Sequence, residues 1–164
     1  RSLYVENDIR FTKGLNMGED MMVMMKLFIC AGKVGIVHRP FYHYRQSNPE
    51  SLTKIYSQEH IIQVANNVYE VEKYVNASAY ADSLIEFIPF LKLNIKLPLL
   101  ITDDKSHYEQ WLECFPEANC YVMNNKLLPL RTRIIQWMAV KRYFILLRLY
   151  YRTVFKLVYG IIYK

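Results

Sequence analysis

The chain has 164 residues, of which 52% are hydrophobic, 22% are charged and 15% are aromatic. This composition excludes an intrinsically disordered or low-complexity protein, because the apolar fraction is high and glycine and proline contribute only 5 and 6 residues. The length suits one domain with a substantial core. No charge-free run reaches the roughly 18 residues that a membrane-spanning helix needs, so we expect no span.

Charge is distributed unevenly along the chain. Residues 1–117 contain 12 Lys and Arg against 15 Asp and Glu, a net charge of −3, whereas residues 118–164 contain 9 Lys and Arg and no acid, a net charge of +9. A segment this basic indicates an anionic partner, either lipid headgroups or nucleic acid. Cys30, Cys114 and Cys120 match neither a zinc-ligand spacing nor a disulfide framework, so we expect free or buried thiols in a reducing cytoplasm.

The first long predicted helix follows Gly18. Glu19 and Asp20 open an apolar stretch that extends from Met21 to Cys30, and acids in a first turn interact favourably with the positive end of a helix dipole. Because this helix is apolar nearly all round, we expect it to be buried against other layers.

A small β element is expected next. Residues 34–45 are rich in β-branched and aromatic side chains around Pro40, which predicts two short strands. A polar loop over residues 46–53 follows them.

A long helix is predicted over residues 57–75, with Ser57 as its N-cap. Ser78 is a candidate cap for the next helix, which Pro89 is expected to kink or end. The apolar face of the long helix consists of Ile61, Val64, Ala65, Val68, Val71 and Val75.

Two more helical regions are expected towards the C-terminus. Asp103 or Asp104 can cap a short helix with an apolar repeat at i, i+3, i+4 and i+7, formed by Tyr108, Trp111, Leu112 and Phe115. From Pro129 the chain is helical again, and Arg148, Arg152 and Lys156 repeat every four residues. Opposite this basic row lies an apolar face of Val140, Phe144, Leu147, Tyr151, Val154 and Val158. The fold class expected is α+β, mainly α, with helices around a small β element and a helical C-terminal region.

Residues 7–54 resemble the C-terminal part of the catalytic domain of family 2 glycosyltransferases, the inverting GT-A enzymes that build bacterial capsules, lipopolysaccharide and exopolysaccharide. The matching segments are Ile9-Arg10-Phe11, Gly14-Leu15-Asn16-Met17-Gly18-Glu19-Asp20, Ile36-Val37-His38-Arg39-Pro40-Phe41-Tyr42-His43-Tyr44-Arg45 and Ser51-Leu52-Thr53. The resemblance implies a GT-A α/β enzyme that moves a sugar from a nucleotide-sugar donor to a hydroxyl of a glycan or lipid-linked acceptor, with inversion.

In that family the acid that closes the Glu-Asp pair is the catalytic base. The resemblance therefore assigns the base to Asp20, with Glu19 beside it as support. The alternative is that both acids only stabilise the start of a helix.

The segment Tyr42-His43-Tyr44-Arg45 and the loop after it resemble the part of the family that closes over the donor diphosphate. Arg45 is assigned to phosphate, because a guanidinium offers a bidentate fork; otherwise it is a surface residue that ends a strand. His43 is a candidate metal ligand or else a packed or solvated histidine. Ser51 either donates to a phosphate oxygen or caps a turn.

The sequence departs from the family in one respect. It has no Asp-X-Asp motif, with which the family holds a metal and the diphosphate, and Asp103-Asp104 is expected to be a helix cap. We therefore expect a C-terminal fragment, inactive alone, whose divalent metal (Mg or Mn) is held mainly by residues outside this chain. The expected division is residues 1–54 for the catalytic part, 55–128 for a helical accessory region and 129–164 for basic amphipathic helices.

The basic tail predicts a location. An amphipathic helix with cations on one face and aromatic and aliphatic residues on the other fits the headgroup region of a membrane. The eight basic residues from Arg131 to Lys164, each adding about 1 kcal/mol near an anionic surface, are expected to hold the protein at the inner face of the cytoplasmic membrane. Alternatively, the tail buries its aromatic residues in a homo-oligomer or against the rest of a longer enzyme.

Two other functions fit the tail. A nucleic-acid-binding protein would use stacking aromatics and arginines, but the helical spacing suits a continuous apolar face better and the sequence has no zinc-finger or helix-turn-helix signature. A non-catalytic helical adaptor at the membrane surface would need neither Asp20 nor Arg45. The preferred partners are the donor, the acceptor and an anionic membrane, without nucleic acid.

Overall fold

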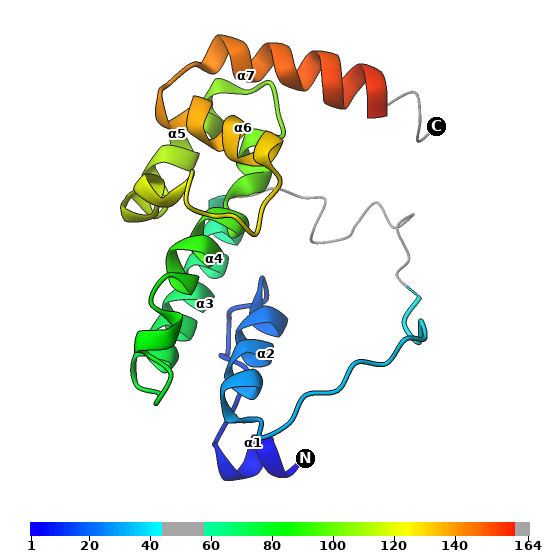
Figure 1. Cartoon of the computed structure of the whole chain (residues 1–164), viewed down its shortest axis with the longest axis vertical. Helices are drawn as coiled ribbons and strands as arrows, with labels where there is room; N and C mark the ends of the chain where they lie inside the picture. The colour runs from blue at the N-terminus through cyan, green and yellow to red at the C-terminus, as the bar shows by residue number, and fades with distance from the viewer. Residues whose placement is uncertain (44–57, 160–164) are drawn as a thin grey trace. The chain divides into compact units, whose positions relative to one another are not determined.

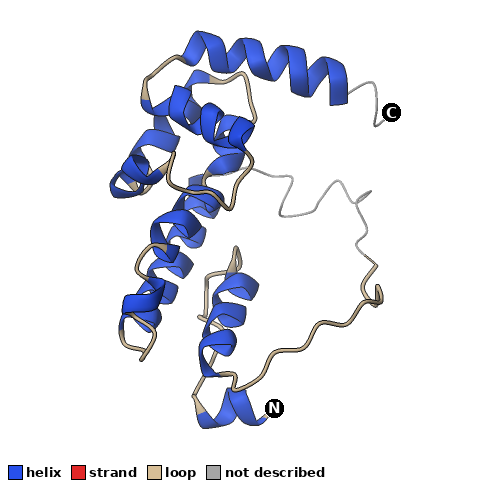
Figure 2. Ribbon diagram, viewed as in Figure 1, coloured by secondary structure: helices blue, strands red, loops and turns tan. Residues whose placement is uncertain are grey.

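The computed structural model describes residues 1–43 and 58–159, which belong to two compact units, Arg1–Leu84 and Ile85–Lys164. Helices account for 64% of the structure, and the described residues contain no strand (Figure 2). The mainly helical prediction is therefore confirmed. The boundary between the units falls inside the region 55–128 that was expected to be one helical accessory segment.

The strand pair predicted near residues 34–45 is not formed over residues 34–43, and residues 44 and 45 lie outside the described ranges. Residues 34–43 form no regular secondary structure, and their side chains are exposed. A strand is stable only when a neighbouring strand accepts and donates its backbone hydrogen bonds, and this segment has no such partner within the described residues. The α/β frame of a GT-A enzyme therefore has no strand to support it there.

The first unit consists of helices α1 (Ser2–Glu6), α2 (Glu19–Cys30) and α3 (Gln58–Asn76) and a 3₁₀ turn, η1 (Asp82–Leu84). Helices α2 and α3 pack side by side (Figure 1). Their shared core contains Ile9, Met22, Val23, Val68, Val71 and Val75. The three valines of α3 lie on the predicted apolar face, and burying each contributes roughly 1.5 kcal/mol or more.

Helix α2 is buried along one stripe only, contrary to the expectation of burial nearly all round. Met22 and Val23 are buried, whereas Met24 and Phe28 are 53% and 47% exposed. The reason is that α3 covers one side of α2, and no second layer of described residues covers the other.

The second unit begins with α4 (Phe87–Ile95), the 3₁₀ turn η2 (Leu97–Leu100) and α5 (Lys105–Glu113). It continues with the 3₁₀ turn η3 (Pro116–Tyr121), α6 (Leu130–Val140), α7 (Phe144–Tyr150) and a π-helical segment, η4 (Tyr151–Tyr159). Its core is formed by Ile88, Leu93, Leu99, Leu100, Tyr108, Trp111, Phe115, Ala118, Val122, Ile135, Ala139 and Leu147.

Helix α5 begins as predicted. The Asp104 carboxylate accepts a 2.9 Å hydrogen bond from the backbone N–H of Ser106, and this side-chain cap satisfies one of the N–H groups that a helix start leaves without a partner. Of the predicted apolar positions, Tyr108, Trp111 and Phe115 are buried.

Two other expectations for helix ends were wrong. Pro89 lies in the first turn of α4 instead of ending a helix, and a proline is tolerated there because first-turn N–H groups have no partner within the helix. Ser78 closes the turn after α3: its hydroxyl donates to the Val75 carbonyl (2.7 Å) and accepts from the Tyr80 N–H (3.1 Å).

The C-terminal helical region is interrupted between α6 and α7. Arg142 adopts a left-handed conformation with φ +57°. Its N–H donates to the Ala139 carbonyl and the Tyr143 N–H donates to the Met138 carbonyl, at 2.9 and 2.8 Å. This is the Schellman arrangement, which ends α6 and lets α7 start in a new direction.

Candidate functional site

Asp20 occupies the first turn of α2 and is exposed. One of its carboxylate oxygens, Oδ1, accepts a 2.7 Å hydrogen bond from the N–H of Met21. Glu19 precedes it and is half-buried. The two acids thus lie together at the positive end of the helix dipole, an arrangement that serves a helix cap and a rigid carboxylate equally well.

Gly18 sets the direction in which the chain enters α2. Its φ is +78°, a left-handed conformation that is unfavourable for other residues, and its carbonyl accepts the first helical hydrogen bond from Met22 N–H at 3.1 Å. A Cβ at this position would lie 3.7 Å from Val64 of α3, which is ordinary contact. The backbone conformation, more than crowding, therefore requires glycine directly before Glu19 and Asp20.

Two polar side chains of α3 hold the loop that leads into α2. The Asn67 side-chain amide donates to the Met17 carbonyl at 2.8 Å, and Gln63 Oε1 accepts from the Asn16 N–H at 2.9 Å. The sequence analysis missed both residues. Asn67 lies three residues after Val64 and four before Val71 on the predicted apolar face, and a buried amide at such a position signals a fixed backbone partner.

The other predicted site residues are only partly described. His43 is exposed at the end of the segment that follows α2. Arg45 and Ser51 lie outside the described residues. The structure therefore brings Glu19 and Asp20 together and leaves the phosphate-binding assignments as predictions.

The residues that the structure describes do not by themselves form a metal site. No group of three or more His, Cys, Asp or Glu side chains converges on one point within residues 1–43 and 58–159. Asp103 and Asp104 have structural roles: Asp103 bonds to Arg152 at 3.5 Å, and hydrogen bonds from the Ser106 N–H and hydroxyl hold the pKa of Asp104 below its usual value.

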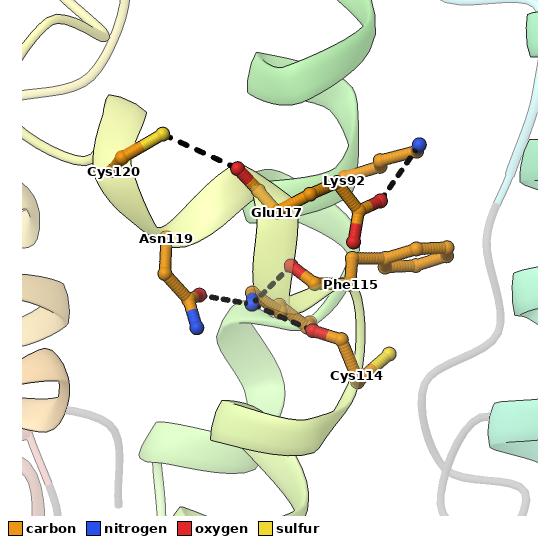
Figure 3. Close-up of polar contacts among 7 residues, drawn as sticks. Lys92, Cys114, Phe115, Glu117, Asn119 and Cys120 are labelled. Atoms are coloured by element: carbon orange, nitrogen blue, oxygen red, sulfur yellow. Dashed lines mark hydrogen bonds and ion pairs between the residues drawn. The ribbon is translucent and has the colours of Figure 1, made fainter.

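A pair of buried lysines was not anticipated. Lys92 is 4% exposed and its ammonium lies 2.9 Å from Glu117. Lys96 is 1% exposed, and its ammonium donates to the backbone carbonyls of Trp111, Cys114 and Phe115 at 3.1, 2.7 and 3.3 Å and to Asn119 Oδ1 at 2.5 Å. Figure 3 shows Cys114, Phe115 and Asn119 around this site, with the Lys92–Glu117 ion pair beside them. It also lies 4.1 Å from the centre of the Trp111 ring.

The Lys96 ammonium stabilises the C-terminal end of α5. A cation at a helix C-terminus interacts favourably with the dipole and satisfies carbonyls that have no partner within the helix. Burial lowers the pKa of Lys96 to about 8, although the neighbouring Cys114 and Glu117 favour its charged form. All the N–H groups of the ammonium face protein oxygens in an enclosed site, so this lysine holds the fold together and is not placed to act on a substrate.

The apolar face of the C-terminal tail packs within the second unit. Leu147 is buried, and the Phe144 ring lies 5.6 Å from the Tyr108 ring of α5. Of this face, which was expected to enter the headgroup region, Leu147 is buried and Val140, Phe144, Tyr151 and Val154 are half-buried. The basic row Arg148, Arg152 and Lys156 is exposed, as predicted, and apolar side chains of α7 are exposed near it, namely Ile145, Leu146 and Leu149.

Within the described residues, no helix is both long and apolar enough to cross a membrane.

Comparison with protein-family models, with curated proteins and with solved structures finds no match to this chain. The resemblance of residues 7–54 to family 2 glycosyltransferases therefore stays a prediction.

Proposed function

We propose that this chain is the C-terminal portion of an inverting, nucleotide-sugar-dependent glycosyltransferase, with Asp20 as the general base. One observation carries the proposal: the acid that the sequence resemblance assigns to this role is exposed on the first turn of a helix that packs into the core of its unit. Gly18 fixes the helix entry, and Asn67 and Gln63 hold the loop before it. A general base needs this combination of solvent access and rigid support.

The proposed reaction is a single displacement. The oxygen of an acceptor hydroxyl attacks the anomeric carbon of the donor sugar, its bond to that carbon forms as the bond to the diphosphate breaks, and its proton passes to the Asp20 carboxylate. Oδ1 is engaged by the Met21 N–H, so the second carboxylate oxygen takes the proton. Attack opposite the leaving group inverts the anomeric configuration. Positioned base catalysis contributes roughly 10²- to 10⁴-fold.

The donor diphosphate and its metal are proposed to lie mainly with a nucleotide-binding half outside this chain. Arg45, His43 and Ser51 would close over the diphosphate from this side. Several large apolar side chains of the first unit are individually exposed, and contact with a further part of the enzyme would remove them from water. They lie on α2 and on the segment that follows it, namely Met24, Phe28, Val34, Ile36, Val37 and Phe41.

The tail supports a place at the inner face of the cytoplasmic membrane, where lipid-linked acceptors are found. Arg148, Arg152 and Lys156 are exposed together with apolar side chains of α7. A surface that mixes cations and aliphatic side chains in this way binds anionic headgroups. A non-catalytic adaptor would use the same surface, and it is distinguished by having no activity that depends on Asp20.

The proposal is tested by assaying nucleotide-sugar turnover with the 164-residue chain alone and with the complete product of its reading frame. We expect transfer to a glycan or lipid-linked acceptor only from the complete product. Sugar transfer or sustained donor hydrolysis by the 164 residues alone would contradict the assignment as a portion. Absence of both activities from the complete product, over a panel of donors and acceptors, would favour the adaptor.

A further inference from the structure

The second unit contains a pocket of about 290 Å³ at the start of α5 and the turn between α6 and α7. Its lining residues are Lys105, Arg142, Phe144, Ile145 and Arg148. Three of the five are cations, and none is an acid. A concave site with this lining favours an anion that has an apolar neighbour.

Two of the three cations are available to a ligand. The third, Lys105, forms an ion pair with Glu109 at 3.1 Å. The nearby acids have partners of their own, since Asp104 accepts from Ser106 and Asp103 pairs with Arg152. The charge of Arg148 helps to lower the pKa of Asp104 without direct contact. Neither the guanidinium of Arg148 nor that of Arg142 makes a hydrogen bond or ion pair with any residue that the structure describes.

The backbone at Arg142 supports a role for its side chain. The left-handed position after a helix, here at φ +57°, is most often glycine, and an arginine there reduces stability. A residue held in an unfavourable conformation at a pocket indicates that its side chain is used. The guanidinium of Arg142 is the feature that glycine would lack.

We propose that this pocket binds the phosphate monoester of an anionic lipid headgroup, such as that of phosphatidic acid. Guanidinium groups form bidentate, charge-assisted hydrogen bonds with phosphate oxygens, and a monoester presents more of these oxygens than a diester. A lipid source is favoured because Ile145, which lines the pocket, is 84% exposed and Leu146 and Leu149 are exposed on the same helix. Aliphatic side chains beside a phosphate site fit the boundary between headgroups and acyl chains.

This site belongs to the second unit and does not depend on Asp20 or on glycosyl transfer. It would still bind lipid if the chain were an adaptor, so failure of the proposed enzymatic function leaves it standing. Failure of the lipid site would likewise leave the proposed base untouched.

The test measures binding of the full 164-residue chain to vesicles of phosphatidylcholine alone, with phosphatidylglycerol, and with phosphatidic acid, the two anionic mixtures being matched in surface charge. We expect wild type to prefer phosphatidic acid over phosphatidylglycerol by about tenfold or more, because the pocket adds charge-assisted hydrogen bonds to the general attraction. Arg142→Gly and Arg148→Ala should each lose most of this preference. Lys156→Ala removes a charge from the exposed basic row and leaves the pocket residues unchanged. It should weaken binding to both kinds of anionic vesicle about fivefold while keeping the preference for phosphatidic acid.

Arg142→Gly distinguishes a loss of lipid binding from a loss of stability, because glycine adopts the left-handed conformation at this position more favourably than arginine does. We expect this variant to unfold at a higher temperature than wild type while it binds phosphatidic acid more weakly. Equal binding of wild type to the two anionic lipids would overturn the proposal, as would a preference that survives in both pocket variants. Binding of inorganic phosphate with the same variant dependence, but without preference among vesicles, would overturn the lipid assignment.

Discussion

The side-chain amide of Asn67 donates a 2.8 Å hydrogen bond to the main-chain carbonyl of Met17, joining α3 to the loop that leads into α2. Asn67 is fully buried, and within the described residues its Oδ1 has no hydrogen-bond partner. Burying an amide oxygen without a hydrogen-bond partner reduces stability, so the one bond that the Asn67 amide makes has to offset that cost. The backbone that this bond fixes is that of residues directly before Glu19 and Asp20.

Asn67→Ala should destabilise the first unit by about 1–3 kcal/mol, since it leaves the Met17 carbonyl without its donor and removes packed atoms. Asn66→Ala is the matched control, because Asn66 is exposed on the same helix, and it should change the free energy of unfolding by no more than about 0.5 kcal/mol. Urea unfolding of the two variants measures the difference. Equal stabilities would show that the Asn67 bond does not hold the loop.

Lys96 should make the second unit more stable as pH rises above 8. The folded-state pKa, about 8, is below the ordinary value of 10.5, so between these values the unfolded chain binds more protons and the free energy of unfolding rises with pH. The complete shift corresponds to about 3 kcal/mol.

A variant isolates this effect, because burial raises the pKa of the Cys114 thiol and of the Tyr108 hydroxyl, and both groups act in the opposite sense at high pH. The difference in unfolding free energy between wild type and Lys96→Met should shift in favour of wild type from about pH 8 to pH 10. A difference that stays constant or moves towards the variant would contradict the lowered pKa of Lys96.

Glu117 should contribute to the loss of stability in acid. Burial raises the pKa of this carboxyl. The hydrogen bond from Lys92 and the charges of Lys92 and Lys96 lower it by more than burial raises it, so the net pKa is below 4.5. A lowered folded-state pKa gives stability that is present above 4.5 and is lost as pH falls through the folded value. The unfolding temperature of Glu117→Gln should be lower than that of wild type at neutral pH. It should also decrease less than that of wild type when the pH is lowered. Glu113 is exposed on α5, so Glu113→Gln is the control and should show the wild-type dependence of unfolding temperature on pH. The same wild-type dependence in Glu117→Gln would show that Glu117 does not contribute to the loss of stability in acid.

Helices whose apolar residues keep one period could be predicted from the sequence. The valine stripe of α3 and the cap and stripe of α5 lie where the pattern placed them. The prediction of strands was wrong over residues 34–43, because strand formation depends on a partner and a β-branched composition alone does not supply one. Pro89 was misplaced because a proline fits the first turn of a helix as well as it ends one.

The buried lysines show how a local signal was overlooked. Ile88, Lys92 and Lys96 recur every four residues, so both lysines lie on the buried side of α4 and its extension. Their partners, Glu117 and the carbonyls at the end of α5, are distant in sequence, and hydrophobicity patterns contain no information on such pairings. At the candidate site, the proposal of Asp20 as the base rests on the resemblance alone, whereas the contacts of Asn67 and Gln63 with the loop before it became evident only from the packing of α3.

The most direct test of the proposed base is the kcat of the intact enzyme with Asp20→Asn. Asparagine has nearly the same shape and also suits a helix start, so thermal unfolding should not change, but it cannot accept the acceptor's proton. We predict that kcat falls by about 10²- to 10⁴-fold while the KM for the donor changes little. Transfer at a near wild-type rate by Asp20→Asn would contradict the assignment and leave Asp20 as a residue that only stabilises the start of α2.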